Sequence, residues 1–351
     1  MYTIFYDDIT IASTSHPTFA VTSGTITQAK NSADSFTFVL PATNPERDTP
    51  QIRRGIITVV RDGETIFKGD VISTRIRFDG SREIECQGCL AWLNDVVNVR
   101  ITASSTVATS FRNRISRYNS MCAPKRTLLE GKCTNKPTAT VSILTPSEFI
   151  SVFEYFKRLI DSKGGMLLPR YAGNDVYIDY VDTKGKTSNQ EIYFGRNLLD
   201  LENYISAENT ATALFPVGDN NITIASVNPT GESYIVNAPM YARYGMIAQS
   251  ASYNVATPAE LLAEATATLN ALAVLNQTIT LSAIDLSMID ATAEGIEIGD
   301  TVHAVSIAHG LDTDLECTEK SIDIVNPANS EITLGKTLKS LTKIIALGGI
   351  Q

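Results

Sequence analysis

Hydrophobic and polar residues alternate along the last third of the chain. In the run QTITLSA at 277–283, every second residue from 279 on is apolar, and the residues between them are Thr or Ser. A period of two gives a strand one buried and one solvated face. Further strand-like runs follow in GIEIGDTVHAVSI, DLECTEKSIDIV and NSEITLG, with a turn at NPAN, 326–329. Several short strands at close spacing predict a small β-barrel or sandwich here.

The first part of the chain, to about residue 89, also has strand character throughout. Turn sequences interrupt the alternating runs at 7–8 (Asp-Asp), 62–63 (Asp-Gly) and 79–80 (Asp-Gly). Asp-Gly between alternating strands is a strong hairpin signal, because type I′ turns need positive φ at both central positions. We therefore predict a second small barrel at the N-terminus.

The middle of the chain has helical signals. The sequence TPSE at 145–148 has the form of a capping box with proline at the first helical position, and an apolar stripe at helical spacing follows from Phe149 to Ile160. Gly164-Gly165 ends this predicted helix, and MLLPRYAGNDVYIDYVD then predicts a hairpin. A second capping box, TPAE at 257–260, predicts a helix over 258–275.

These elements predict a mainly β protein with an α+β insertion. We expect an N-terminal β-barrel domain at 1–99, an α+β domain at 100–200, a linking α/β segment at 201–276, and a C-terminal β-barrel domain at 277–351.

Composition excludes several classes of protein. The 351 residues are 43% hydrophobic and 19% charged, with a net charge of −9 and a pI near 5.0, which argues against a general binder of duplex DNA. The N-terminus does not resemble a signal peptide, and polar residues interrupt the most apolar helical run, at 261–275, so we expect no membrane span. Five cysteines, an odd number, suggest synthesis in a reducing cytoplasm.

Candidate catalytic and metal-binding residues are few. The three histidines, His16, His303 and His309, do not form an HExxH motif. The five cysteines are Cys86, Cys89, Cys122, Cys133 and Cys317. They lack a peptidase signature, and the simpler interpretation is that they are buried free thiols. The first two could form half a zinc site with the next two, although the second pair is spaced too widely.

Other motifs are equally weak. The GKT sequences at 185–187 and 335–337 lack the upstream glycine of a P-loop. The basic residues concentrated at 100–136 form either a solvated face or a docking surface for an acidic partner. We predict no catalytic, cofactor-binding or metal-binding residues, and a protein that is not an enzyme.

Several blocks of sequence stand out in order along the chain: SKGGMLLPRY (162–171), YIDYVDTKGKTSNQ (177–190), FGRNLLDLENYISAENTATALFPVGD (194–219), AIDLS (283–287), IGDTV (298–302), HGLDT (309–313) and IVNPANSEITLG (324–335). These blocks resemble the prophage endopeptidase tail family, the tail-hub proteins of siphophage tail tips. Ala213 and Phe215 depart from the family pattern, where a basic and an aliphatic residue are expected.

The resemblance implies a structural hub in the tail tip or baseplate of a phage, or of a phage-tail-like bacteriocin. It implies a homotrimer whose barrels ring a channel, a distal tail protein and a tape-measure protein as partners, and a separate receptor-binding or lysin subunit as a further one. Two barrels in each of three chains would let a trimer continue a six-fold tube. The location implied is the virion, after synthesis in the bacterial host cytoplasm.

Two other functions are weaker candidates. The first is a tail-associated peptidoglycan hydrolase acting during genome entry; in many family members such a region follows the hub, and this chain stops at Gln351 after the last predicted barrel. The second is a carbohydrate-binding module, which one tryptophan and 7% aromatic residues do not favour.

Acidic residues are concentrated near the C-terminus, where 281–343 holds eleven acidic and only four basic residues. A channel that passes DNA without binding it should present negative charge, which acts over roughly one Debye length of about 8 Å. We therefore expect some of these carboxylates to face the channel, with Glu297, Asp300 and Glu316 as the first candidates.

Overall fold

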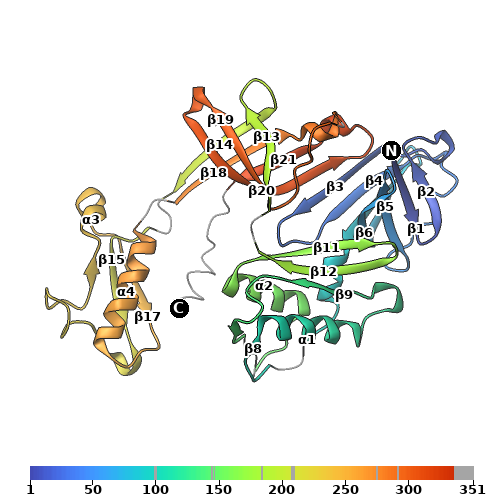
Figure 1. The fold of residues 1–351 in the computed structure, drawn as a ribbon. Helices are drawn as coiled ribbons and strands as arrows, with labels where there is room; N and C mark the ends of the chain where they lie inside the picture. The colour runs from blue at the N-terminus through green and yellow to red at the C-terminus, as the bar shows by residue number, and fades with distance from the viewer. Residues whose placement is uncertain are drawn as a thin grey trace. The chain divides into compact units, whose positions relative to one another are not determined.

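The computed structural model describes residues 1–98, 101–143, 145, 147–182, 185–206, 210–273, 276–290 and 292–335 (Figure 1). It is mainly β, as predicted. The described residues form two compact units, one of 1–200 with 281–335 and the other of 201–280. This division is coarser than our four-part prediction, whose boundaries stay a prediction. None of the described helices combines the length and apolar character that crossing a bilayer requires.

Among the described residues, a sheet of thirteen strands contains most strands of the larger unit. Its strands are β1 (Tyr2–Tyr6), β2 (Ile9–Ser13), β3 (Ser23–Ala29), β4 (Ser35–Leu40), β5 (Ile56–Arg61), β6 (Glu64–Ile76), β7 (Arg82–Gly88), β13 (Thr187–Tyr193), β14 (Leu198–Ser206), β18 (Asn276–Ile284), β19 (Thr301–Ser306), β20 (Leu311–Asp323) and β21 (Glu331–Gly335). Their order is β14-β18-β21-β20-β3-β4-β7-β6-β5-β1-β2, and β19 pairs with both β20 and β13. Two of these strands, β14 and β18, extend into the range 201–280.

The two predicted barrels are not separate and not closed. Strand β20 pairs antiparallel with β3, with Ile322 opposite Ile26, so the N-terminal and C-terminal strands belong to one sheet (Figure 1). The N-terminal strands curl around a common core that also holds Ile322 and Ile324. No pairing among the described strands joins the two ends of the sheet. The expectation of two closed barrels within the chain is corrected to one open, curved sheet.

The N-terminal hairpins occur where their turn sequences predict them. Strands β1 and β2 meet at Asp7-Asp8, β5 and β6 at Asp62-Gly63, and β6 and β7 around 79–80. Asp62 has φ 49° and Gly63 has φ 91°, the two positive values that a type I′ turn requires.

The predicted α+β part lies in the same compact unit. Its elements are β8 (Ser105–Thr106), α1 (Val107–Asn119), β9 (Leu129–Cys133), β10 (Thr140–Val141), α2 (Val152–Lys163), β11 (Met166–Ala172) and β12 (Asp175–Val181). Strands β11 and β12 form the predicted hairpin, and β9 adds parallel to β12. Both helices pack on this sheet through an aromatic core that includes Phe111, Phe156 and Tyr180.

Helix α2 begins later than predicted. Its N-cap is Ser151, whose Oγ accepts a hydrogen bond from the Glu154 backbone N–H at 3.0 Å. Thr145, the predicted cap, is buried, and its Oγ1 accepts a hydrogen bond from the Ile101 backbone N–H at 3.1 Å instead. Two successive capping-box patterns are present, at 145–148 and at 151–154, and the one whose hydroxyl is free to cap begins the helix.

This difference in helix start can be measured. We expect Ser151→Ala to lower the free energy of unfolding by about 1 kcal/mol, since it leaves a helical N–H without its acceptor. Ser147→Ala, at an exposed position in the wrongly predicted cap, should change it by less than about 0.5 kcal/mol. Urea denaturation of both variants tests this, and the reverse order of effects would contradict the observed start.

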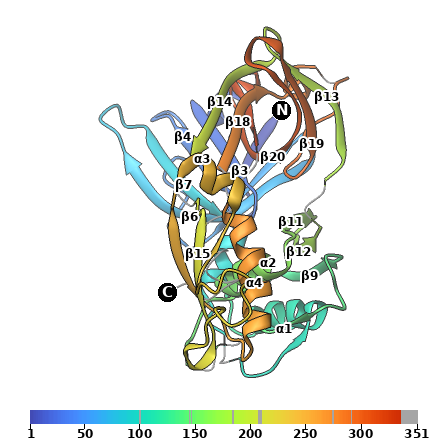
Figure 2. The same ribbon diagram turned by 90° about the vertical axis from the view of Figure 1, so that its left-hand side faces the viewer.

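The smaller unit has its own core. It contains β15 (Ala213–Val217), β16 (Ile235–Val236), α3 (Ala238–Tyr244), β17 (Ala248–Ser252) and α4 (Pro258–Leu272). Helix α4 lies against β15 in a core that includes Leu214, Leu261 and Leu269 (Figure 2). The predicted capping box is confirmed, because Thr257 Oγ1 accepts from the Glu260 N–H at 3.3 Å. The helix ends at Leu272, and the last two residues of the predicted range lie outside the described residues.

Short 3-10 helices connect many of these elements. They are Pro17–Phe19, Cys89–Asn94, Pro124–Arg126, Asp219–Asn221, Leu286–Met288, Ile307–His309 and Pro327–Asn329. The second of them contains Trp92, and its side chains join the core of the α+β part.

Candidate functional site

The cysteines are not arranged for catalysis or metal binding. All five are free, and Cys86, Cys89 and Cys317 are buried. Burial raises the pKa of Cys89 and of Cys317 to about 12, and it raises the pKa of Cys86 well above its ordinary value. A protonated thiol is neither a nucleophile nor a metal ligand. Among the described residues, no group of three or more Cys, His, Asp or Glu side chains could hold a metal ion.

Thiol labelling tests this description. We expect a disulfide reagent to modify at most Cys122 and Cys133 in the native protein, since these two are only half-buried. All five thiols should react after unfolding in urea. Rapid native labelling of Cys86, Cys89 or Cys317 would show that the buried environment is wrong.

The histidines make local contacts. The ring of His303 lies between two carboxylates: Asp314 Oδ1 is 2.8 Å from the ring Nδ1, and Asp312 Oδ1 is 3.3 Å from the ring Nε2. The hydrogen bond to Asp314 raises the pKa of His303. His309 Nδ1 lies 2.6 Å from Ser306 Oγ, a pair that the sequence analysis did not single out. Ser306 is buried, and no hydrogen bond joins a cysteine to a histidine in the described residues. The Ser306-x-x-His309 spacing across a 3-10 turn is the one signal that could have revealed the pair.

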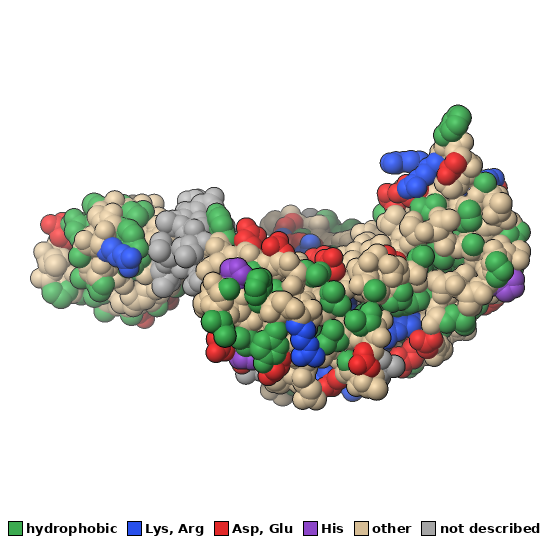
Figure 3. Space-filling view, turned by 90° about the horizontal axis from the view of Figure 1, so that it is seen from above, with side chains coloured by type: hydrophobic (Ala, Val, Ile, Leu, Met, Phe, Trp, Pro, Cys, Tyr) green, Lys and Arg blue, Asp and Glu red, His purple; other side chains and the backbone are tan. Residues whose placement is uncertain are grey.

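Several basic side chains of the run at 100–136 form ion pairs with acidic residues of this same chain. Arg126 Nη2 lies 2.7 Å from Oδ2 of Asp70, a buried residue of β6, and Lys125 Nζ lies 2.7 Å from Asp7 Oδ2. Arg112 pairs with Glu130 at 3.0 Å. The acidic partner of this run is therefore in part the N-terminal sheet. Acidic and basic side chains are interspersed over the larger unit in the view of Figure 3.

Motif residues from two separate blocks, Gln190 and Asp285, meet Lys320 in a buried polar cluster. Asp285 of AIDLS accepts a hydrogen bond from Gln190 Nε2 at 2.8 Å, and its Oδ2 lies 3.4 Å from Lys320 Nζ. Lys320 also donates to the Ile296 carbonyl at 2.7 Å. Asp285 is 1% exposed and Lys320 is 3% exposed. Burial raises the pKa of Asp285, but the Lys320 charge and the hydrogen bonds from Gln190 and Ser287 outweigh it, so the pKa is lowered.

Asp300 of the IGDTV block is also buried. Its Oδ1 accepts from the Lys186 N–H at 3.0 Å, and its Oδ2 accepts from the Glu297 N–H at 2.9 Å. The expected exposure of Asp300 to a channel is therefore corrected, because these backbone bonds hold the carboxylate inside. Glu316 pairs with Lys30 at 2.5 Å, and Glu297 has an exposed side chain beside Lys320. Contacts from Gln190 of β13 and Lys320 of β20 thus hold Asp285 and Ile296 in place.

Exposed apolar residues occur at two turns of the larger unit. Strand β6 pairs with β5 only as far as Asp70, and from there the β6–β7 hairpin continues to a tip where Ile76 is 66% exposed and Phe78 is fully exposed (Figure 2). At the turn between β19 and β20, Ile307 is 91% exposed, near Phe194, whose ring packs edge-on against His309. Contiguous exposed apolar patches mark interaction surfaces, whereas single exposed apolar side chains are common.

The fold is shared with solved tail proteins. A tail protein from Neisseria meningitidis is similar over 97% of this chain and 96% of its own, with a TM-score of 0.60 and 15% identity. A 43 kDa prophage tail protein from Shewanella oneidensis covers 95% and 96%, with a TM-score of 0.62 and 12% identity. A prophage tail protein from Listeria monocytogenes covers 99% and 97%, with a TM-score of 0.55 and 15% identity. The chain therefore has a tail-protein fold over nearly its whole length.

A family match covers part of the chain. Residues 186–345 match the family described as prophage endopeptidase tail, so the resemblance predicted from the sequence is confirmed over this range. Among curated proteins, none matches the chain.

Proposed function

We propose that this chain is a structural hub of the tail tip of a phage or of a phage-tail-like bacteriocin. It assembles as a homotrimer at the distal end of the tail tube and adapts a six-fold tube to a three-fold tip. It is made in the host cytoplasm and becomes part of the virion. The observation that carries this proposal is the open, curved sheet of thirteen strands among the described residues, in a fold shared with tail proteins.

An open sheet of this size supports a ring of copies. The sheet ends at β2 on one side, and an edge strand presents backbone groups that can pair with another chain. Head-to-tail contacts close into a ring when the rotation between neighbours allows it. In this proposal, the barrels predicted from the sequence are completed between neighbouring copies.

The proposal includes partners. The hairpin tip at Phe78 and the turn at Ile307 give the assembled hub apolar surfaces for the distal tail protein, the tape-measure protein and a receptor-binding or lysin subunit. DNA passes through the central channel without specific binding.

The hub is a structural protein in this proposal, and the hydrolase alternative has no observation in its favour. Burial raises the pKa of the Cys86, Cys89 and Cys317 thiols, so these three are protonated. Two acidic residues of the family-like motifs, Asp285 and Asp300, hold nearby segments of the chain in place. We expect the pure protein to leave a peptidoglycan gel uncleared. Clearing that a single carboxylate or cysteine substitution abolishes would contradict this part.

Light scattering tests the trimer. We expect the purified chain, alone or co-expressed with its distal tail protein, to have a mass of about three times 38.1 kDa. A concentration series separates a weak trimer from a stable one. A stable dimer, or a monomer that persists with the distal tail protein present, would contradict the proposal.

A further inference from the structure

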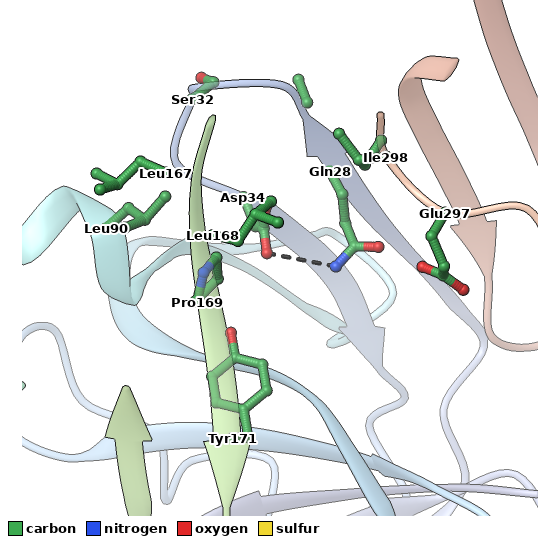
Figure 4. Close-up of a pocket in the computed structure, with 11 residues that line it drawn as sticks. Gln28, Ser32, Asp34, Leu90, Leu167, Leu168, Pro169, Tyr171, Glu297 and Ile298 are labelled. Atoms are coloured by element: carbon green, nitrogen blue, oxygen red, sulfur yellow. Dashed lines mark hydrogen bonds between the residues drawn. The ribbon is translucent and has the colours of Figure 1, made fainter. Parts of the chain in front are cut away.

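A cavity of about 200 Å³ lies where four parts of the larger unit meet. Its walls come from β3 and the turn after it, the 3-10 helix Cys89–Asn94, β11, and the segment at 297–298 (Figure 4). The apolar part of the wall includes Leu90, Leu167 and Ile298. The polar part includes two carboxyl groups, those of Asp34 and Glu297.

Asp34 is a buried carboxyl group with little compensation. It is 7% exposed, and its one side-chain hydrogen bond from the described residues comes from Gln28 Nε2, at 3.4 Å (Figure 4). No Lys or Arg of the described residues forms an ion pair with it. Its backbone carbonyl accepts from the Gly88 N–H at 2.7 Å, which holds the residue in place. A buried carboxylate without a neighbouring cation is energetically costly, so the surroundings of Asp34 favour the binding of a cationic group.

The other groups around Asp34 supply no positive charge. Glu297 is acidic, and its Oε1 lies 3.3 Å from Lys320 Nζ on the side of the buried cluster. Tyr171 of β11 and Cys89 are neutral, because burial raises the pKa of both groups. The cavity thus combines two acidic groups, neutral polar groups and apolar walls.

We propose that this cavity binds the side chain of a lysine or arginine from a partner polypeptide. The ammonium or guanidinium group would lie against Asp34 and Glu297, and the aliphatic stem would lie along Leu90, Leu167 and Ile298. Lysine and arginine carry both parts, an apolar stem and a charged end, and this cavity offers a surface for each. All residues that line the cavity belong to one chain, so the inference does not depend on the proposed trimer. A small alkyl cation can therefore test it on the single chain.

Proton release accompanies this binding. Burial raises the pKa of Asp34 to about 7, against a smaller opposing effect of the Gln28 hydrogen bond. Below that pH the incoming cation displaces the carboxyl proton to solvent, and above it the carboxylate is already ionised. Affinity should therefore rise with pH, by roughly tenfold per unit below the pKa, and level off above it.

Carboxyl 13C NMR of the whole chain tests the proposal with n-propylguanidinium and n-butylammonium as probes. We expect either cation to lower the pKa of Asp34 by about 1–3 units. N-propylurea, which has nearly the shape of propylguanidinium without its charge, should leave that pKa unchanged. The cation with the larger effect identifies arginine or lysine as the natural source. If neither cation moves the pKa of Asp34, or if the urea moves it equally, the proposal is wrong.

Calorimetry with variants gives a second readout. Asp34→Asn should abolish binding of the cation, and Glu297→Gln should weaken it several-fold. Asp161→Asn, at an exposed carboxylate on α2, is the matched control and should bind as the unmodified chain does. Unchanged binding by Asp34→Asn would overturn the assignment. If that variant fails to fold, the NMR titration of the unmodified chain still decides.

Discussion

Replacing Lys320 with methionine should lower the free energy of unfolding by about 3–5 kcal/mol, the typical cost of removing one partner of a buried ion pair. Methionine keeps most of the volume of the side chain but leaves the buried Asp285 carboxylate without the ammonium that lies 3.4 Å away. The Ile296 carbonyl also loses its 2.7 Å hydrogen bond. Urea denaturation followed by fluorescence of Trp92, the only tryptophan, measures the loss.

Lys186→Met is the control for this experiment. Lys186 pairs with Glu294 at the surface, where water and salt replace the interaction, so we expect little change in stability. Adding Asp285→Asn to Lys320→Met should recover part of the loss, because it removes the unpaired charge. A Lys320→Met variant as stable as Lys186→Met would show that the buried cluster does not hold Asp285 and Ile296 in place.

The second large effect has the opposite sign. Asp34→Asn should raise the free energy of unfolding above about pH 7 by up to about 4 kcal/mol, since its pKa moves from 3.8 unfolded to about 7 folded and each unit corresponds to about 1.4 kcal/mol. The folded chain holds a proton on Asp34 that the unfolded chain releases. The unmodified protein therefore loses stability as pH rises from about 4 to about 7, and asparagine removes that loss.

The pH dependence distinguishes this effect from a simple packing change. The gain of Asp34→Asn should be small near about pH 3, where the carboxyl is largely protonated in both states, and should grow toward about pH 7. Asp161→Asn, on the exposed side of α2, should show no such growth. A constant difference between Asp34→Asn and the unmodified chain at every pH would contradict a raised pKa at Asp34.

Local turn chemistry was enough to predict the N-terminal hairpins and the start of α4. Asp62-Gly63 and Thr257 act within a few residues, through positive φ values and a capping hydrogen bond. The start of α2 was missed because Thr145 satisfies a distant partner, Ile101, which no local pattern reveals.

Long-range pairing could not be predicted from the sequence pattern. Strands β3 and β20 pair through residues such as Ile26 and Ile322, and the sequence of neither strand indicates which other strand it pairs with. The period of two indicated two β regions but not that they share a sheet.

The buried polar cluster was also hidden in the sequence. In β20 the inward face passes from Leu315 and Cys317 to Lys320 and Ile322, and an irregularity between Cys317 and Glu319 shifts the alternation by one residue. This shift turns a lysine inward that strict alternation would expose. Asp285 and Asp300 belong to the acidic residues concentrated at 281–343, and their distant partners, Gln190 and Lys186, could not be recognised from the local sequence.

The number of copies of this chain in each particle, and their position, tests the hub proposal most directly. Quantitative mass spectrometry of purified particles, combined with gold-labelled antibody in electron micrographs, would measure both. The account predicts three copies, all at the distal end of the tail. Many copies along the length of the tail, or no copies in the purified particle, would contradict it.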